Sequence, residues 1–301
     1  MKKLLILFVL LGQIAFAQQI DVKSINLLKG TESGGFYHPA FSPKGNYLLT
    51  TTENYAGLTQ HSLTTNEVKK LTADAGAGYD VRISADENTI LFKKTEFQNN
   101  LRYTSLQQYN LQEKKETQLV KATREKITPV FAQNQIAYVK GSTLLRAGAA
   151  TTEKILPLIN IENQKMVLYN GTKKTVLAPN GTDASYFWAS VSPDQKHIVY
   201  TIAKGGTFVC NIDGSKPVSL GKLNAPKWLN NQWVVGMNDS DDGDVITAST
   251  IVSATIDAKV RQTLATPQAP IAMYPAASAD GKQIAFNSDK GEIYILDINI
   301  K

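Results

Sequence analysis

The densest group of residues that could do chemistry is an acidic stretch late in the chain. It begins at Asn238 and places four aspartates within six residues: Asp239, Asp241, Asp242 and Asp244. Carboxylates this close repel one another unless a cation, a basic partner or water screens them. The spacing of the oxygen donors resembles a calcium loop, although Ser249 stands where such a loop needs a bidentate glutamate. A solvated acidic turn and a Ca²⁺ site both stay open, and no other cofactor is expected.

Histidine chemistry is restricted, because the chain has three histidines. No G-x-S-x-G sequence occurs, which argues against a serine hydrolase of the α/β type. A histidine-rich metal site needs several imidazoles that converge, and only His38 is expected at the mouth of a channel, with His61 on a more peripheral strand. Packing of His38 against a neighbouring loop is the alternative. We assign no catalytic residue.

Aromatic residues recur just ahead of short apolar runs, at intervals along most of the chain. If these positions share one rim, they suit a small-molecule, glycan or peptide site. Packing between structural units is an equally plausible role for the set. The candidate ligand-binding residues are Tyr37, His38, Tyr79, Asp80, Tyr186, Trp188, Trp228 and Tyr274.

The elements that would position these residues are repeated strands. A turn signal built on Ser, Pro, Asp and Gly, followed by an apolar β-rich run, recurs at residues 41–50, 83–92, 191–200 and 277–286. Weaker copies begin near Pro129 and Pro226. The segment from Leu106 to Lys126 could pass for an amphipathic helix, but the repeat favours a strand hairpin there. Four strands per unit at this spacing predict the blades of a β-propeller.

We expect an all-β, six-bladed propeller, with seven blades as the alternative. The interval between the anchors at 132 and 192 is 60 residues, which we attribute to an inserted hairpin around Ile159 to Tyr169. The last unit ends after three strands, and Val22 to Leu28 has the apolar pattern of the missing outer strand. Pairing of the two ends would close the ring and cover an exposed edge.

The segments from Tyr37 to Leu48 and from Met273 to Phe286 resemble the WD40-like PD40 repeat. That repeat forms the propeller of the TolB-like family, and the resemblance covers the propeller without the N-terminal domain of TolB. Oligogalacturonate lyases are similar propellers. The resemblance implies a fold rather than an activity, because the repeated residues lie in turns and cores.

The first residues predict export. Met1-Lys2-Lys3, an apolar run from Leu4 to Leu11 and Ala15-Phe16-Ala17 form the pattern of a signal peptide at 1–17, followed by one propeller domain at 18–301. Cleavage would lower the net charge from +6 to +4. The other lysines and arginines are scattered along the sequence without the basic stripe of a nucleic-acid-binding protein. The single cysteine, Cys210, is expected to be a buried, inert thiol.

We therefore expect a periplasmic or secreted protein without a transmembrane span after cleavage. The favoured function is a non-enzymatic binding or scaffolding module for a protein, peptide or glycan at the rim. The alternative is a carbohydrate-active enzyme, a lyase or glycosidase, that uses the rim carboxylates.

Overall fold

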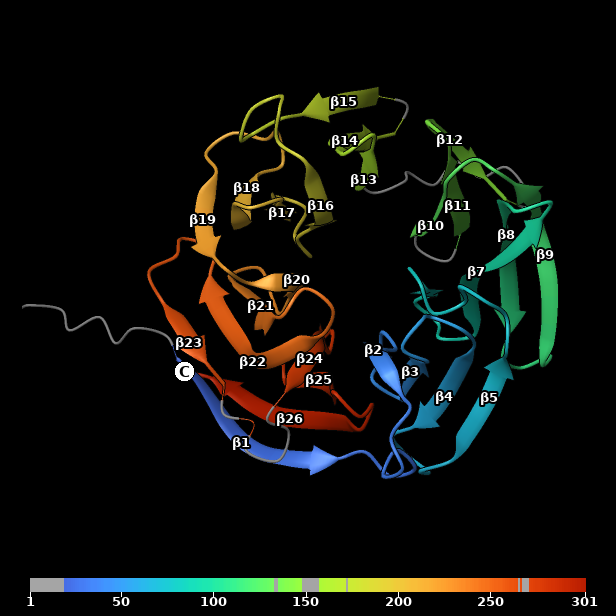
Figure 1. Ribbon diagram of the computed structural model, residues 1–301, viewed down its shortest axis with the longest axis horizontal. Coiled ribbons are helices and arrows are strands. Elements are labelled where there is room, and N and C mark those ends of the chain that lie inside the picture. The colour runs from blue at the N-terminus through green and yellow to red at the C-terminus, as the bar shows by residue number, and fades with distance from the viewer. Residues whose placement is uncertain (1–18, 133–134, 148–156, 172, 265, 267–270) are drawn as a thin grey trace, which may run out of the picture.

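The computed structural model describes residues 19–132, 135–147, 157–171, 173–264, 266 and 271–301. Within these ranges every regular element is a β-strand, and the strands form seven antiparallel sheets arranged around a central opening (Figure 1). The fold is a seven-bladed β-propeller. The predicted signal peptide lies outside the described residues. No helix able to cross a membrane occurs in the described part of the chain.

The blades follow the chain in order. Blade 1 contains β2 (Tyr37–Phe41), β3 (Tyr47–Thr51), β4 (Leu58–Ser62) and β5 (Val68–Thr72), and blade 2 contains β6 (Arg82–Ile83), β7 (Thr89–Gln98), β8 (Leu101–Asn110) and β9 (Lys115–Thr123). Blade 3 contains β10 (Ile127–Ala132), β11 (Gln135–Lys140) and β12 (Thr143–Arg146), and blade 4 contains β13 (Leu158–Glu162), β14 (Lys165–Asn170) and β15 (Lys173–Leu177).

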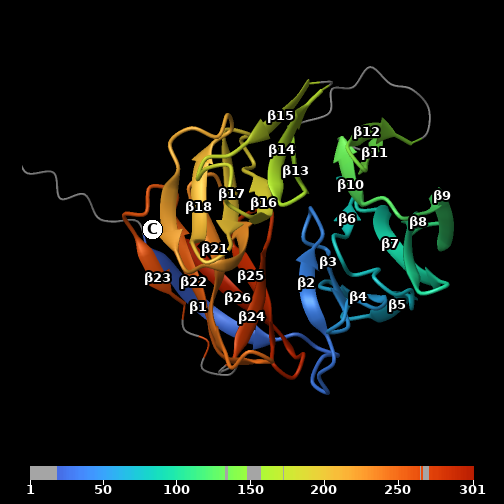
Figure 2. The same ribbon diagram turned by 45° about the horizontal axis from the view of Figure 1, so that its top comes forward.

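The second half of the ring contains blades 5, 6 and 7. Blade 5 contains β16 (Tyr186–Val191), β17 (His197–Ile202), β18 (Gly206–Asn211) and β19 (Val218–Gly221). Blade 6 contains β20 (Asn224–Trp228), β21 (Trp233–Asp241), β22 (Ile246–Thr255) and β23 (Arg261–Thr263). Blade 7 contains β24 (Ala272–Ala277), β25 (Gln283–Ser288), β26 (Ile293–Ile300) and, from the other end of the chain, β1 (Ile20–Leu27). The first strand of each blade faces the opening (Figures 1 and 2).

The expectation of six blades is wrong, and the alternative of seven is the observed number. The hairpin around Ile159 to Tyr169 is not an insertion, because it forms β13 and β14 of a separate sheet, blade 4. Blades 3 and 4 have strands of four to six residues and three strands each in the described ranges. Because their strands are short, two blades fit into the 60-residue interval in which the sequence predicts one blade with an inserted hairpin.

The repeated turn signal has a local chemical cause. In three copies a buried serine accepts a hydrogen bond from the backbone N–H five residues later and donates its own proton to an aspartate two residues later. Ser192, for example, accepts from the His197 N–H at 3.0 Å and donates to Asp194 at 2.7 Å. The serine and aspartate together fix the turn between the first two strands, so the motif repeats with the blade.

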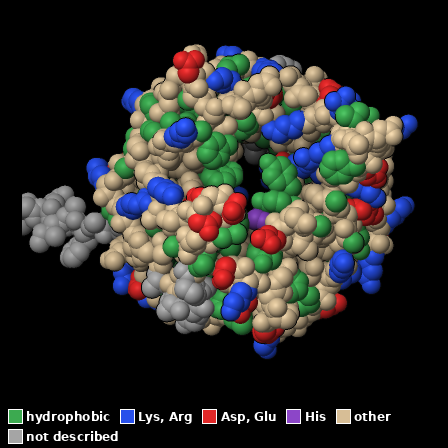
Figure 3. Space-filling view, viewed as in Figure 1, with side chains coloured by type: hydrophobic (Ala, Val, Ile, Leu, Met, Phe, Trp, Pro, Cys, Tyr) green, Lys and Arg blue, Asp and Glu red, His purple; other side chains and the backbone are tan. Residues whose placement is uncertain are grey.

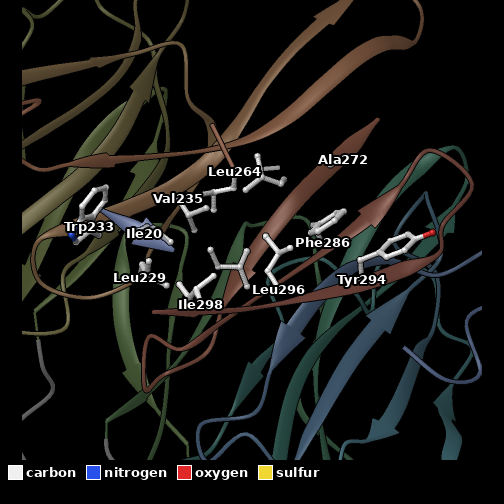
Figure 4. Close-up of a cluster of buried hydrophobic side chains, with 12 residues drawn as sticks. Ile20, Leu229, Trp233, Val235, Leu264, Ala272, Phe286, Tyr294, Leu296 and Ile298 are labelled. Atoms are coloured by element: carbon white, nitrogen blue, oxygen red, sulfur yellow. The ribbon is translucent and has the colours of Figure 1, made fainter. Parts of the chain in front are cut away.

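Apolar side chains pack between neighbouring blades and hold the ring together. The largest cluster joins blades 6 and 7, and its buried members include Trp233, Ile251, Phe286 and Leu296 (Figure 4). A buried cluster also lies at each of the other six boundaries, from blade 1 against blade 2 round to blade 7 against blade 1. Burial of apolar surface, which contributes about 25 cal/mol per Å², stabilises each of these boundaries.

The ring closes as the sequence predicts. Strand β1 pairs antiparallel with β26, with Ile20 opposite Ile300 and Leu27 opposite Tyr294. Ile20 is buried in the cluster between blades 6 and 7, and its backbone N–H and C=O both bond to the side chain of Gln262 on β23. The N-terminal strand therefore completes blade 7 and covers the edge that β26 would otherwise expose.

Candidate functional site

The inner strands carry the feature that shapes the rim. In five blades a non-glycine residue within two positions of the start of the innermost strand has a positive φ between 49° and 64°: His38, Asp80, Trp188, Ala225 and Tyr274. In four of these blades the pairing of the first two strands slips at this point, which is a β-bulge. Bulges re-aim side chains next to functional sites, and here they turn the affected side chains away from the regular pleat.

His38 is packed rather than free. Its ring stacks on Tyr55 with centroids 4.0 Å apart and lies 4.4 Å from Tyr274, and its Nε2 is 3.2 Å from the carbonyl oxygen of Glu53. Burial lowers the pKa of His38 to about 4, with the positive charge of Lys227 adding to the effect. The imidazole is therefore neutral at physiological pH and serves as part of an aromatic cluster.

A second cluster on the same rim is ionic. Asp80 bonds to Arg82 at 2.5 Å and faces the ammonium of Lys93 at 3.6 Å. That ammonium also lies 4.3 Å from the centre of the Tyr79 ring. The Lys93 side chain is only 8% exposed, and burial lowers its pKa to about 8, partly offset by Asp80. The carboxylate and the ring stabilise a charge that burial would otherwise neutralise.

Close backbone packing fixes the position of Tyr79. A Cβ atom on the preceding residue, Gly78, would lie 2.3 Å from side-chain atoms of Thr51 on β3, so only glycine fits there. The N–H of Gly78 donates to the carbonyl of Tyr55 at 3.1 Å. The link between blades 1 and 2 therefore packs closely against blade 1. The ring of Tyr79 lies edge-on to the ring of Tyr55, and Tyr79 is 51% exposed.

These residues form one wall of a groove of about 790 Å³ between blades 1, 2 and 3. Its lining combines two tyrosines with four cationic side chains: Tyr55, Tyr79, Lys93, Arg102, Arg124 and Lys126. Glu125 is the acidic residue of the lining, and it is paired with Lys140 at 3.0 Å. The groove is a positively charged concavity with an aromatic side.

The two arginines of the groove have free guanidinium groups. Neither Arg102 on β8 nor Arg124 ahead of β10 has a hydrogen-bond or ion-pair partner in the part of the chain that the structure describes, and both are exposed. Lys126 is held in place differently, because its Nζ donates to the carbonyl of Ile161 at 2.7 Å on blade 4. Burial lowers the pKa of Lys126, while the charges of Asp80 and Glu162 oppose that change.

The basic groove is the feature that sequence reasoning missed. The lysines and arginines look scattered along the sequence, but folding brings Lys93, Arg102, Arg124 and Lys126 together. Figure 3 shows Lys and Arg side chains near one side of the central opening and acidic side chains near the other. One of these residues could have been found from the sequence. Lys126 lies just ahead of an inner strand, as the candidate aromatic residues do.

Three of the candidate residues have packing roles. Tyr186 is 1% exposed, and its hydroxyl donates to the carbonyl of Gly181 at 3.0 Å. Trp228 donates from its indole N–H to the carbonyl of Ser190 at 3.2 Å and packs against the cluster between blades 5 and 6. Tyr37 donates to the carbonyl of Asp289 at 3.2 Å and links blade 1 to blade 7.

Trp188 lies apart from the groove. It is 43% exposed, its ring packs edge-on to Phe187, and it borders a second pocket of about 490 Å³ between blades 5 and 6. Lys204 and Lys222 also line this pocket. The candidate aromatic residues therefore do not form one surface: Tyr79 belongs to the groove, Tyr274 to the His38 cluster and Trp188 to a pocket of its own.

The acidic stretch lies in blade 6 and is mostly strand. Asn238, Asp239 and Asp241 are part of β21, and only the residues from Asp242 to Val245 form the turn to β22. The sequence alone predicts a solvated acidic turn or a calcium loop over the whole stretch, whereas strand β21 continues as far as Asp241. The hairpin is longer than the repeat predicts.

Its carboxylates are engaged locally. Asp242 accepts the backbone N–H groups of Asp244 and Val245 at 3.0 and 2.9 Å, which lowers its pKa, and Asp241 accepts the N–H of Gly243. Asp239 is buried and accepts from the Asn224 amide at 2.8 Å. In the described ranges no group of three or more His, Cys, Asp or Glu side chains could hold a metal ion.

Cys210 is buried in blade 5 and unpaired, as the sequence predicts. Burial raises the pKa of its thiol to about 12, so it carries no thiolate at neutral pH. His61 is also buried, on β4, and its Nε2 lies 2.8 Å from the hydroxyl of Thr50. Neither residue borders the groove.

No family model matches this chain. No curated protein matches it either. Solved structures do: an oligogalacturonate lyase in complex with manganese has a TM-score of 0.50 at 15% identity, over 88% of this chain and 78% of that one. TolB from Acinetobacter baumannii has a TM-score of 0.51 at 15% identity, over 80% of this chain and 56% of that one. The chain has a TolB-like β-propeller fold. A lyase from Vibrio parahaemolyticus is similar, with a TM-score of 0.49 at 13% identity over 87% of this chain and 78% of that one.

At these identities the likeness shows the fold alone. The TolB-like propeller spans about half of the TolB chain to which it is similar. One of the lyases contains manganese, but the described residues of this chain do not offer the cluster of ligands that such an ion would need.

Proposed function

We propose that this protein is an exported binding module that holds an acidic ligand, a peptide or protein segment or a glycan, in the groove between blades 1, 2 and 3. The observation that carries the proposal is the convergence of four cationic side chains and two tyrosines on one concavity of about 790 Å³. The proposal is for binding without catalysis.

The charge of the groove selects the class of ligand. Arg102 and Arg124 have no internal partner among the described residues, and the single acidic residue of the lining is neutralised by Lys140. A cleft lined by one sign of charge concentrates the field between its walls and attracts a ligand of the opposite sign. Arginine also binds carboxylate and phosphate with two parallel hydrogen bonds, which fixes the orientation of the ligand.

The tyrosines add a surface for stacking. Half of the Tyr79 ring is exposed, and its inner face lies on the Lys93 ammonium, so the ring is held rigidly. Rigid aromatic side chains provide contact area at low entropic cost and stack on sugar rings, peptide groups or aromatic side chains. Charge and stacking together favour a polymer with repeated acidic groups over a single small metabolite.

Export to the periplasm or beyond is part of the proposal and rests on the predicted signal peptide at 1–17. The single thiol, that of Cys210, is buried, which suits a compartment in which exposed free cysteines are oxidised.

The test compares acidic and neutral probes. The protein is titrated into three fluorescently labelled probes at low salt: oligoglutamate, oligogalacturonate and neutral dextran. Oligogalacturonate is an acidic saccharide that appears in the name of one structural neighbour. We expect at least one acidic probe to bind, and the variant Arg102→Gln/Arg124→Gln to bind it about tenfold or more weakly, because two charge-assisted contacts are lost.

The matched control removes two exposed lysines from turns on the opposite rim, Lys44→Gln/Lys282→Gln, and should leave the affinity within about twofold. The proposal fails if both acidic probes bind no better than dextran, or if the two double variants lose the same affinity.

A further inference from the structure

The hairpin of β7 and β8 extends beyond the rest of blade 2. Its two strands pair without a break from Thr89 opposite Asn110 to Gln98 opposite Leu101. The outer strand β9 pairs with β8 only as far as Thr104, and the inner strand β6 pairs with β7 only near its start. The tip of the hairpin therefore lies past the ends of the two flanking strands.

A two-residue turn fixes the conformation of this tip. Its central residues, Asn99 and Asn100, have φ angles of 50° and 61°. Positive φ at both central residues is characteristic of a type I′ turn, which matches the twist of the flanking strands and favours asparagine. The turn keeps the last residue pairs in register, so the side chains at the tip have defined directions.

The register places Phe97 on the wall of the groove. Phe97 lies directly opposite Arg102. Opposite residues of an antiparallel pair point to the same face with Cβ atoms about 5 Å apart, and residues two or four apart on one strand share a face. Lys93 shares this face with Phe97, Thr104 shares it with Arg102, and three of these four residues line the groove: Lys93, Arg102 and Thr104. Phe97 therefore continues the groove wall beyond Arg102.

Phe97 is 70% exposed, the highest fraction among the large apolar side chains of the described residues. A single exposed apolar residue is ordinary on a protein surface, but this one lies beside a free guanidinium at the end of a charged concavity. Its ring has no polar atom, so contact with an apolar group is what it can offer a ligand. Leu101, at the same tip, is opposite Gln98 and points to the other face.

We propose that Phe97 contacts the ligand, and that the ligand of the groove is an acidic peptide segment with an apolar side chain within two residues of a carboxylate. This inference rests on the proposed function and narrows it to one class of ligand. In an extended peptide, side chains two residues apart lie on the same side and about 7 Å from each other. One can cover the Phe97 ring while the other binds the Arg102 guanidinium.

Charge alone does not distinguish a peptide from a glycan, whereas Phe97 does. An acidic glycan repeats its charged group along the chain and has no apolar side chain to cover the ring. A peptide can present acidic and apolar side chains in the same segment, and burial of both against Phe97 removes apolar surface from water.

The test uses two fluorescently labelled peptides of equal charge, a run of glutamates with phenylalanine at its centre and the same run with serine there. We expect the wild-type protein to bind the phenylalanine peptide about fivefold or more tightly. Phe97→Ser should abolish this preference and leave the affinity for the serine peptide within about twofold. Phe97→Leu should retain most of the preference, because the side chain stays large and apolar.

The matched control is Leu101→Ser, which removes an exposed apolar side chain from the same tip but from the other face. It should keep the preference for the phenylalanine peptide. The affinity for oligogalacturonate should be the same in the wild type and in Phe97→Ser, and all variants should keep the circular dichroism spectrum of the wild type.

The inference is overturned if the wild type binds both peptides equally, or if Leu101→Ser abolishes the preference as fully as Phe97→Ser does. It is also overturned if Phe97→Ser weakens oligogalacturonate as much as the phenylalanine peptide, which would mean that the ring stacks on a sugar. Loss in Phe97→Ser of binding to anionic phospholipid vesicles, with the peptide preference kept, would assign the tip to a membrane surface instead.

Failure of this inference is distinguishable from failure of the proposed function. If both peptides bind equally and Arg102→Gln/Arg124→Gln loses both, the groove holds an acidic ligand and only the role of Phe97 is wrong. If neither peptide binds better than dextran, the groove proposal is wrong and this inference with it.

Discussion

Two charged regions lie on the rim of this propeller, and they differ in how their charges are satisfied. The acidic hairpin of blade 6 is contiguous in sequence, and Asp241 and Asp242 accept hydrogen bonds from backbone N–H groups of their own turn. The basic groove combines residues from two blades and the links between blades, and its two arginines have no partner in the described ranges. Carboxylates of the first region accept hydrogen bonds from their own turn, whereas the two arginines of the second have guanidinium groups left to bind a ligand.

This difference shows that density of charge along a sequence is a poor indicator of a site. Neighbouring aspartates in a hairpin turn stabilise the turn by accepting backbone N–H groups. Cations that converge from separate elements are held together only by the fold, so their mutual repulsion costs stability unless a ligand or a half-buried carboxylate such as Asp80 compensates for it. The comparison can be tested by changing each region in the same way.

The largest effect should follow reversal of charge. In Arg102→Glu/Arg124→Glu two attractive contacts become repulsive, and we expect affinity for an acidic probe to fall by about 100-fold or more. The matched change in the hairpin, Asp241→Lys/Asp242→Lys, should leave the affinity within about threefold or raise it slightly. Titration of labelled oligoglutamate measures both, and equal losses in the two variants would contradict the assignment.

A smaller effect should follow titration of Lys93. Its pKa in the folded protein is about 8, below the ordinary 10.5, so the groove loses one positive charge as the pH rises through 8. We expect affinity for an acidic probe to fall by about tenfold between pH 7 and pH 9. The unfolded chain binds more protons than the folded one between these two pKa values, so the Lys93 contribution to stability rises over the same window.

Lys93→Met separates this effect from other titrations. The variant should bind the probe more weakly at pH 7 and show a flatter pH profile, and its stability should rise less with pH than that of the wild type. Identical pH profiles for the variant and the wild type would show that Lys93 stays charged or does not face the ligand.

A still smaller effect should follow removal of the exposed tyrosine. Tyr79→Ala takes away a stacking surface and the ring that lies on the Lys93 ammonium, and we expect about a fivefold loss of affinity. Trp188→Ala is the matched control, because Trp188 is similarly exposed but borders the separate pocket between blades 5 and 6. If Trp188→Ala costs more affinity than Tyr79→Ala, the ligand lies on the other side of the rim.

Calcium should have the smallest effect. The hairpin carboxylates accept hydrogen bonds from their own turn, and no cluster of ligands for a metal ion occurs in the described residues, so millimolar calcium should not shift the midpoint of thermal unfolding. Scans with calcium and with a chelator measure this directly. A calcium-dependent rise that Asp241→Asn/Asp242→Asn abolishes would establish a cation site in the acidic hairpin.

Much of the fold could be predicted from the sequence because its cause is local. In three turns the serine bonds to an aspartate two residues later and to a backbone N–H five residues later, so the motif is visible in the sequence, as at Ser192 and Ser278. Pairing of β1 with β26 was predictable because a missing outer strand at one end matched an apolar segment at the other. The number of blades was not, because blades 3 and 4 lack the turn motif and have short strands.

The site was harder to predict because its causes are tertiary. Nothing in the sequence around Arg102 or Arg124 marks either residue as part of a site. Only the packing of the link between blades 2 and 3 brings them beside Tyr79 and Lys93. The aromatic residues were found, but their roles were not, since nothing in the sequence distinguishes buried Tyr186 from exposed Tyr79. The position of Lys126 in the repeat, just ahead of an inner strand, does predict that this lysine lies at the rim.

The most direct test of the central claim is a crystal structure of the protein with oligoglutamate or oligogalacturonate. The account predicts ligand density in the groove, with acidic groups on Arg102 and Arg124 and the chain against the face of Tyr79. Density confined to the pocket beside Trp188 or to the acidic hairpin, with the groove empty, would contradict it.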